Sequence, residues 1–114
     1  MKLEISHAKD RFSVLELGAG RDDFKTRYTC PNCSQITVLV EGDFNSSLFN
    51  DKSVLSPRVV SLLNNNRPLI RENWEEFYDF TCSGCNQSVR VIHSANEFRM
   101  ACHNFVLITV IEIS

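Results

Sequence analysis

Apolar and polar residues follow patterns along the chain that predict a β-rich fold. Residues 1–5 alternate apolar with polar side chains and predict a strand, and residues 11–17 form a second strand-like stretch. The glycines of the segment 18–20 then break the pattern, and without a third glycine or a following helix they predict a plain turn. Residues 105–113 are apolar on both faces, which predicts a central strand at the end of the sequence.

An internal repeat is the most informative pattern. Residues 28–35 read aromatic, Thr, Cys, two turn residues, Cys, small polar, Gln, and residues 80–87 read the same. A run rich in β-branched residues follows each octet, at 36–40 and at 89–92. Turn dipeptides between strand-forming runs are typical of hairpins, so each copy is predicted to be a β-hairpin with its Cys-x-x-Cys at the turn.

Residues 42–78 form an insert of different character between the two copies. Ser56 followed by Pro57 is typical of a helix N-terminus, and an apolar stripe over residues 59–63 continues the helix. Three asparagines followed by Arg-Pro, at 64–68, end it. A short helix is therefore predicted inside the insert, with its apolar stripe facing the core.

The sequence is compatible with two structures for the segment after the second copy. Ser94 and Glu97 have the spacing of a capping box, which predicts a short helix running to Cys102 or His103. The alternative is a continuous hairpin over residues 88–113 with a wide loop.

Length and composition indicate one globular domain. The 114 residues are 43% apolar and 23% charged, a normal balance for a protein with a core, and two separate cores would each be marginal at this length. The expected architecture is a small, β-dominated α+β fold, a single domain over residues 1–114.

Neither end of the sequence suggests a membrane or a secretory pathway. The first residues lack the apolar run of a signal peptide, and the longest apolar run, at 105–111, is far shorter than the roughly 20 residues that span a bilayer. The expected location is the cytoplasm, with no membrane association.

Five cysteines, an odd number with two tight pairs, favour metal binding over disulfides. Two residues between cysteines allow one turn to offer two sulfurs to the same ion, and two such turns complete a tetrahedron. The predicted ligands of a structural Zn²⁺ ion are Cys30, Cys33, Cys82 and Cys85. Three weaker alternatives are a thioredoxin-like redox site at Cys30 and Cys33, an iron centre with the same four thiolates, and disulfides or free thiols.

These two copies resemble the zinc-ribbon (zinc β-ribbon) superfamily, in which Cys-x-x-Cys knuckles at the tips of β-hairpins grip a structural ion. The resemblance covers residues 28–40 and 80–92 and implies a ligand role for the four cysteines. It implies a zinc-ribbon core of two hairpins with the helical insert between the knuckles. Zinc ribbons serve many functions, so the resemblance implies no particular activity.

Three further residues have chemistry of their own but no motif. Cys102 is expected in the core or beside the metal site, because four other cysteines already fill the ligand shell. His93 and His103 flank Glu97, yet no nucleophile is tied to them by a recognisable pattern. A surface position is therefore expected for both histidines.

The expected function is binding of a protein partner and not catalysis. A fully coordinated zinc ion offers no open position for substrate, so no enzymatic activity is predicted. Aromatic residues and arginines are the usual anchors of protein interfaces. The candidate partner-binding residues all lie in the insert: Phe44, Phe49, Arg67, Arg71 and Trp74.

Charge narrows the class of partner. Lys plus Arg number 12 and Asp plus Glu 14, a formal net charge of −2 without a basic block. A small acidic inhibitor, such as an immunity protein that neutralises a basic toxin, fits this size and charge. The alternative is a nucleic-acid-associated zinc ribbon of the transcription or translation machinery, which would need scattered arginines to gather on one face: Arg58, Arg67, Arg71, Arg90 and Arg99.

Overall fold

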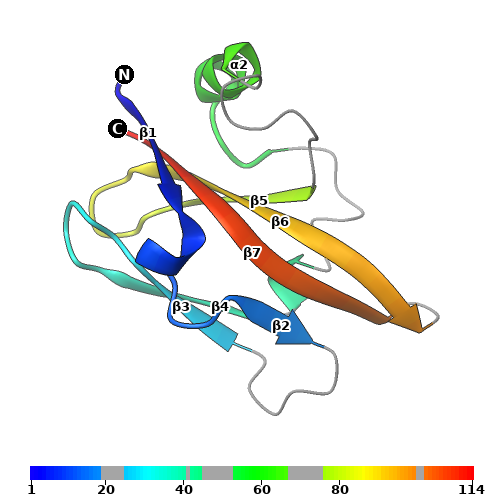
Figure 1. The fold of residues 1–114 in the computed structure, drawn as a ribbon. Coiled ribbons are helices and arrows are strands. Elements are labelled where there is room, and N and C mark those ends of the chain that lie inside the picture. The colour runs from blue at the N-terminus through cyan, green and yellow to red at the C-terminus, as the bar shows by residue number, and fades with distance from the viewer. Residues whose placement is uncertain (19–24, 41, 45–52, 67–75, 100–101) are drawn as a thin grey trace.

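An antiparallel sheet carries a two-stranded hairpin on one face and a helix on the other (Figure 1). The computed structural model describes residues 1–18, 25–40, 42–44, 53–66, 76–99 and 102–114. The strands of the main sheet are β1 (Leu3–His7), β2 (Glu16–Gly18), β5 (Glu76–Thr81), β6 (Ser88–Arg99) and β7 (Cys102–Ile113).

The long strand β7 is the centre of this sheet, whose strand order is β1-β7-β6-β5. Strands β1 and β2 share one edge of β7, with Leu3 opposite Ile113 and Glu16 opposite Val106. A short 3₁₀ helix, η1 (Ala8–Asp10), follows β1. Buried between neighbours on both sides, β7 uses both of its apolar faces, as its sequence predicts.

The first hairpin consists of β3 (Lys25–Thr29) and β4 (Ile36–Val40) and lies against one face of the main sheet. Its inward side chains, Tyr28 and Leu39, join a core cluster with sheet residues that include Val89, Val91 and Val110. Thr26 and Thr37 lie opposite them on the same face, and because side chains alternate along a strand, the residues between these four point outward.

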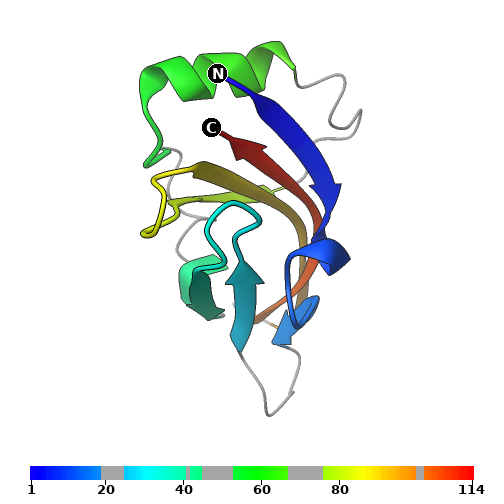
Figure 2. The ribbon, with the colours of Figure 1, turned by 90° about the vertical axis from the view of Figure 1, so that its left-hand side faces the viewer.

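The opposite face of the sheet is covered by α2 (Pro57–Asn65), as Figures 1 and 2 show from two sides. Ser56 is the N-cap, and its side chain accepts a hydrogen bond from the Val59 N–H at 3.4 Å. Val59 and Leu63 are the buried residues of the helix, and they share a cluster with sheet residues that include Ile92 and Ile111. The predicted helix and its inward stripe are confirmed. None of the described helices is long and apolar enough to span a membrane.

A buried ion pair lies on the same face, between neighbouring strands. The Arg90 guanidinium donates to the two oxygens of Asp79 at 2.8 and 2.9 Å and lies 3.8 Å from the centre of the Phe77 ring. Ser53, which precedes α2, also donates to this carboxylate. Arg90 is therefore a structural residue of the sheet, and it does not belong to an exposed arginine face that could meet nucleic acid.

The segment after the second copy is a continuous hairpin, so of the two predicted structures the hairpin is confirmed and the helix from Ser94 is wrong. β6 pairs with β7 from Ser88 opposite Ile113 to Arg99 opposite Cys102, with irregularities at Ile92/His93 and at Glu97/Arg99. The long ladder to the apolar β7 outweighs the local helix signal, since tertiary pairing commonly overrides local preference.

Two other predicted boundaries differ from the structure. Within residues 11–17 only Glu16 and Leu17 belong to β2, and Val14 is instead held by the Thr26 hydroxyl, which donates to its carbonyl at 2.7 Å. The second hairpin begins at Glu76, so the last residues of the predicted insert 42–78 belong to β5.

His93 is fully buried, so its predicted surface position is wrong. The imidazole lies edge-on to the rings of Phe44 and Phe105, and its Nδ1 lies 3.0 Å from the Ser94 carbonyl oxygen. Its Nε2 has no hydrogen-bond partner in the described part of the chain. Burial lowers the pKa of His93, because the charged form would lose its hydration in this aromatic environment.

Acid is expected to destabilise the fold through His93. The folded state holds the ring neutral, whereas the unfolded chain takes up a proton below about pH 6.5, so stability falls as the pH falls through that range. In His93→Leu this part of the pH dependence should disappear, and chemical denaturation between pH 5 and 8 measures it. His7→Leu is the matched control, since His7 is exposed, and an equal loss of pH dependence there would contradict the assignment.

Candidate metal centre

The two Cys-x-x-Cys turns have the same backbone geometry. In the first, the Cys30 N–H donates to the Gln35 carbonyl at 3.0 Å and the Ser34 N–H donates to the Cys30 carbonyl at 2.9 Å. In the second, the corresponding bonds run from Cys82 to the Gln87 carbonyl at 2.9 Å and from Asn86 to the Cys82 carbonyl at 2.8 Å. The sequence repeat is therefore also a structural repeat.

One residue in each turn adopts a left-handed backbone conformation. Ser34 has φ 63° and Asn86 has φ 62°, at equivalent positions of the repeat. Asn adopts this region readily, whereas Ser does so at some cost in free energy. The left-handed conformation at the same position of both turns indicates that both turns need this shape.

The four cysteine sulfurs come together where the turns meet. All of them lie within 4.8 Å of one another, with 3.6 Å between the sulfurs of Cys30 and Cys85 and 3.5 Å between those of Cys33 and Cys82. Metal–sulfur bonds of about 2.3 Å in a tetrahedron place sulfurs about 3.8 Å apart. The residues present thus fit a metal ion such as zinc, and the predicted ligand set is brought together.

The first cysteine of each pair is buried and the second is exposed. Burial raises the pKa of the Cys30 thiol to about 12, because its thiolate would lose hydration. Burial has the same tendency at Cys82, but the backbone N–H groups of Cys85 and Gly84 stabilise its thiolate and lower its pKa to about 7. Four thiolates in so small a volume would require a cation to neutralise them.

Gly84 allows the two turns to approach closely. A Cβ atom at this position would lie 2.6 Å from the Cys33 sulfur and 3.1 Å from the Gln35 Cβ. The first distance is shorter than real Cβ contacts and the second is tighter than most of them, so a larger residue would push the turns apart. The glycine is needed for this contact between the two copies.

Gln87 connects the cysteine cluster to the core. Its side chain is buried, and Nε2 lies 3.8 Å from the Cys30 sulfur and donates to the Tyr28 hydroxyl at 3.3 Å. Its Oε1 accepts a hydrogen bond from Asn32 of the other turn. Groups that donate to ligands fix their orientation and tune the metal, so Gln87 belongs functionally to the centre.

The polar chain continues from Tyr28 into the centre of the sheet. The Tyr28 hydroxyl donates to Glu112 of β7, and the Arg11 Nε lies 3.1 Å from both oxygens of that carboxylate. Burial, followed by the hydrogen bond to Glu112, raises the pKa of Tyr28, so its hydroxyl stays protonated and able to donate. A buried carboxylate needs such partners, and here they also anchor the metal centre to β7.

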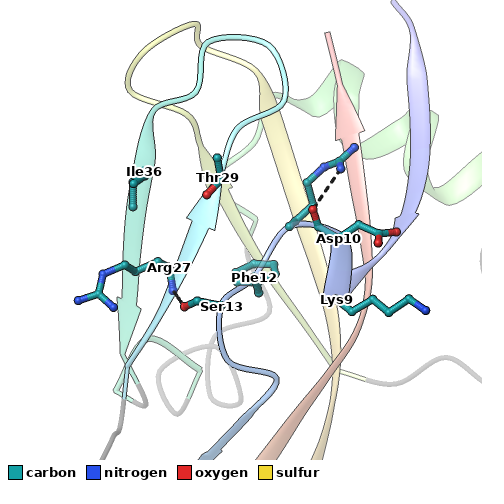
Figure 3. A pocket seen from close by; sticks show the side chains of 8 residues that line it. Lys9, Asp10, Phe12, Ser13, Arg27, Thr29 and Ile36 are labelled. Carbon is teal, nitrogen blue, oxygen red and sulfur yellow. Dashed lines mark hydrogen bonds between the residues drawn. The ribbon is translucent and has the colours of Figure 1, made fainter.

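A shallow pocket of about 310 Å³ lies beside the first hairpin, between β3, β4 and the segment that follows β1. Its charged residues are Lys9, Asp10, Arg11 and Arg27. Figure 3 shows Lys9 and Arg27 extending to opposite sides of it, while Phe12 lies between them. The cationic groups do not converge on one point, and we assign no anion site to this pocket.

The residues predicted to bind a partner are only partly placed by the structure. Phe44 is fully buried, packed against Tyr78, His93 and Phe105, so it is a core residue and not an exposed anchor. The remaining candidates lie outside the described residues: Phe49, Arg67, Arg71 and Trp74. The side chains of Cys102 and His103 are likewise outside the described part of the structure.

Sequence reasoning missed the polar chain that supports the cluster. Tyr28 and Gln87 belong to the repeated octets, and this repetition could have marked them as functional. Nothing in the repeat, however, distinguishes Gln87 from its counterpart Gln35. Arg11 and Glu112 have no such signal, because their pairing joins opposite ends of the sequence.

The chain has no significant match among protein-family models, curated proteins or solved structures. Conclusions about the site therefore rest on its own geometry.

Removing the Gln87 amide is expected to weaken metal binding. Gln87→Ala deletes the donor beside the Cys30 sulfur, and losing such a supporting group typically lowers metal affinity roughly 10- to 100-fold. Competition against a chromogenic chelator measures the change. Gln35→Ala is the matched control, because Gln35 is the repeat equivalent and is exposed. Equal losses in the two variants would contradict the role of Gln87.

Proposed function

We propose that the cysteine cluster is a structural zinc centre and that the chain is a zinc-ribbon-type domain. Support comes from the donor chemistry, since four thiolates in a tetrahedron suit zinc and two Cys-x-x-Cys turns are a common way to supply them. A single iron ion would use the same ligands, and metal analysis separates the two.

A site of this kind holds the protein together and does not process a substrate. Four sulfur ligands fill the tetrahedron and leave no position for water or substrate, so Lewis-acid chemistry has no place there. The first hairpin has only two strands, and such a hairpin is marginal alone in water. Zinc would fasten its tip to the tip of β5–β6 and keep it seated on the main sheet.

We infer further that the domain binds a partner protein through the outer face of the first hairpin. We call this the outer hairpin face, and its exposed residues are Lys25, Arg27, Thr29, Ile36, Val38 and Val40. The observation that carries the proposal is the exposure of its three apolar residues, 53% for Ile36, 50% for Val38 and 45% for Val40. Contiguous exposed apolar residues bordered by polar ones are typical of interaction sites.

The charge of the chain supports a protein over a nucleic acid as partner. The net charge is −2 before any thiolate is counted, and four thiolates with one zinc ion make it more negative. Nucleic-acid affinity depends on many lysines and arginines neutralising phosphates, and Arg90 is committed to Asp79 in the sheet. A protein partner needs no such excess of positive charge.

Removal of zinc is expected to release the first hairpin from the sheet. Purified protein should contain one zinc ion per chain, and a strong chelator should abolish the dispersed amide signals of residues 25–40, because the tips then lose their fastener. NMR with metal analysis of the same sample measures both. Ser83→Ala, which changes the second turn without removing a sulfur, should leave zinc content unchanged. A metal-free chain with an intact hairpin would contradict the proposal.

An acidic substitution on the outer hairpin face is expected to abolish partner capture. Val38→Asp places a charge in the middle of the apolar residues, so cross-linking in a lysate of the producing organism should lose the captured protein. Val54→Asp is the matched control, since Val54 is an exposed valine outside this face, at 71% exposure. Capture that survives Val38→Asp, or that Val54→Asp also removes, would count against this face as the binding site.

A further inference from the structure

Strand β4 is an edge of the hairpin, and its register shows which backbone groups point outward. Its only strand neighbour in the described part of the chain is β3, with Thr29 opposite Ile36 and Arg27 opposite Val38. In an antiparallel pair, residues that bond across the ladder alternate with residues whose N–H and C=O groups face away. One backbone hydrogen bond of known direction is therefore enough to tell which residues of β3 and β4 point their N–H and C=O groups away from the other strand.

Bonds on the far side of β3 give this assignment. The Thr29 N–H donates to the Arg11 carbonyl at 3.0 Å, and the Arg27 carbonyl accepts from the Ser13 N–H at 3.1 Å. Thr29 and Arg27 thus turn their polar groups away from β4, and the residues opposite them must turn theirs away from β3. Ile36 and Val38 consequently direct their N–H and C=O groups to the open edge.

A contact at the end of the strand agrees with this alternation. The Val40 N–H donates to the Asp43 carboxylate at 2.8 Å, so Val40 also faces outward and its donor is capped. Proteins commonly block strand edges with charged side chains in this way. Among the described residues, the outward groups of Ile36 and Val38 are then the part of this edge with neither a strand neighbour nor a cap.

The same two residues combine accessible backbone with exposed apolar side chains. Ile36 and Val38 are each about half exposed, at 53% and 50%, on the outer hairpin face. An extended peptide that adds to a sheet edge bonds to backbone groups and places alternate side chains against such residues. Both requirements are met at one site.

Charge identifies the kind of peptide. Arg27, opposite Val38, is a cation of the outer hairpin face and lies beside the exposed residues of β4. Figure 3 shows the Arg27 side chain extending toward the β4 side of the hairpin. A segment bearing carboxylates is the complement of this face.

A second copy of this chain fits the edge less well. Two β4 strands pairing about Val38 would place Ile36 of each copy opposite Val40 of the other, where Asp43 already occupies the donor. They would also bring together two faces bearing cations. An acidic segment of another protein that pairs with Ile36 and Val38 and ends before Val40 avoids both obstacles.

We propose that β4 accepts an extended segment of a partner protein as an added strand, with apolar side chains over Ile36 and Val38 and a carboxylate beside Arg27. This inference rests on the proposed protein-binding function and specifies its mode and the chemistry of its partner.

Hydrogen exchange on the zinc-loaded protein tests the mode. The probe is a synthetic peptide with blocked ends in which every second residue is threonine, while the residues between them, which share one face of the strand, are valines followed by a glutamate. Its control replaces the glutamate with lysine. In the free protein the amides of Thr37 and Leu39 should exchange slowly, because they bond to β3, while those of Ile36 and Val38 exchange fast. The glutamate peptide should protect Ile36 and Val38. Binding without this protection, or equal binding of the lysine peptide, would overturn the proposal.

Three variants test the groups named. Val38→Pro removes the outward N–H while leaving the β3 ladder intact, as proline is tolerated on edge strands, and it should weaken peptide binding at least tenfold. Val38→Thr keeps the N–H and the branched shape and should bind nearly as well as the wild type. Arg27→Gln should bind the glutamate peptide more weakly than the wild type does, while its binding of the lysine peptide should not decrease. Equal binding by Val38→Pro and Val38→Thr would refute strand addition.

Two outcomes separate this inference from the proposed function. If Val38→Asp abolishes lysate capture while the glutamate peptide fails to protect Ile36 and Val38, strand addition is wrong and the protein-binding face remains. If sedimentation shows a dimer that Val38→Pro dissociates, the occupant is a second copy and the acidic partner is excluded. If capture is insensitive to every change at Val38, both proposals fall.

Discussion

The convergence of four cysteine sulfurs within 4.8 Å is the constraint on which the rest of the structure depends. These sulfurs come from the tips of two hairpins that belong to different sheets, and a bound cation would make their proximity favourable. Gly84 shows how closely the tips must approach, because even a methyl group there would collide with the Cys33 sulfur. Once the tips are fixed, the first hairpin has one place to lie, against the face formed by β5, β6 and β7.

The polar chain from Arg11 through Glu112, Tyr28 and Gln87 gives this junction a rigid support. Each member is held by the next, and the chain ends at the Cys30 sulfur. A carboxylate buried in the central strand would be costly alone, but here its two partners come from the segment after β1 and from β3. The network therefore ties three separate parts of the sequence to the cysteine cluster.

The position of the first hairpin also explains why it has an open side. Its inward residues complete the core, the far edge of β3 is bonded to residues 11–13, and β4 is left as the outer strand. Asp43 caps one end of this edge, which limits indiscriminate pairing but leaves Ile36 and Val38 accessible. A hairpin whose tip is held by zinc would in this way be rigid and would still leave its outer face and the β4 edge exposed.

Local chemistry allowed the sequence to determine much of this protein. The spacing within each Cys-x-x-Cys, the turn residues and the repeat predicted the four cysteines that cluster and both hairpins, and Ser56 with Pro57 located the helix, since these signals act within a few residues. Tertiary structure alone decided the rest. The equivalent residues Gln35 and Gln87 differ in burial because one hairpin lies on the sheet and the other lies within it. His93 and Phe44 are buried together, and β6 is a strand instead of a helix, because contacts distant in sequence outweigh local preference.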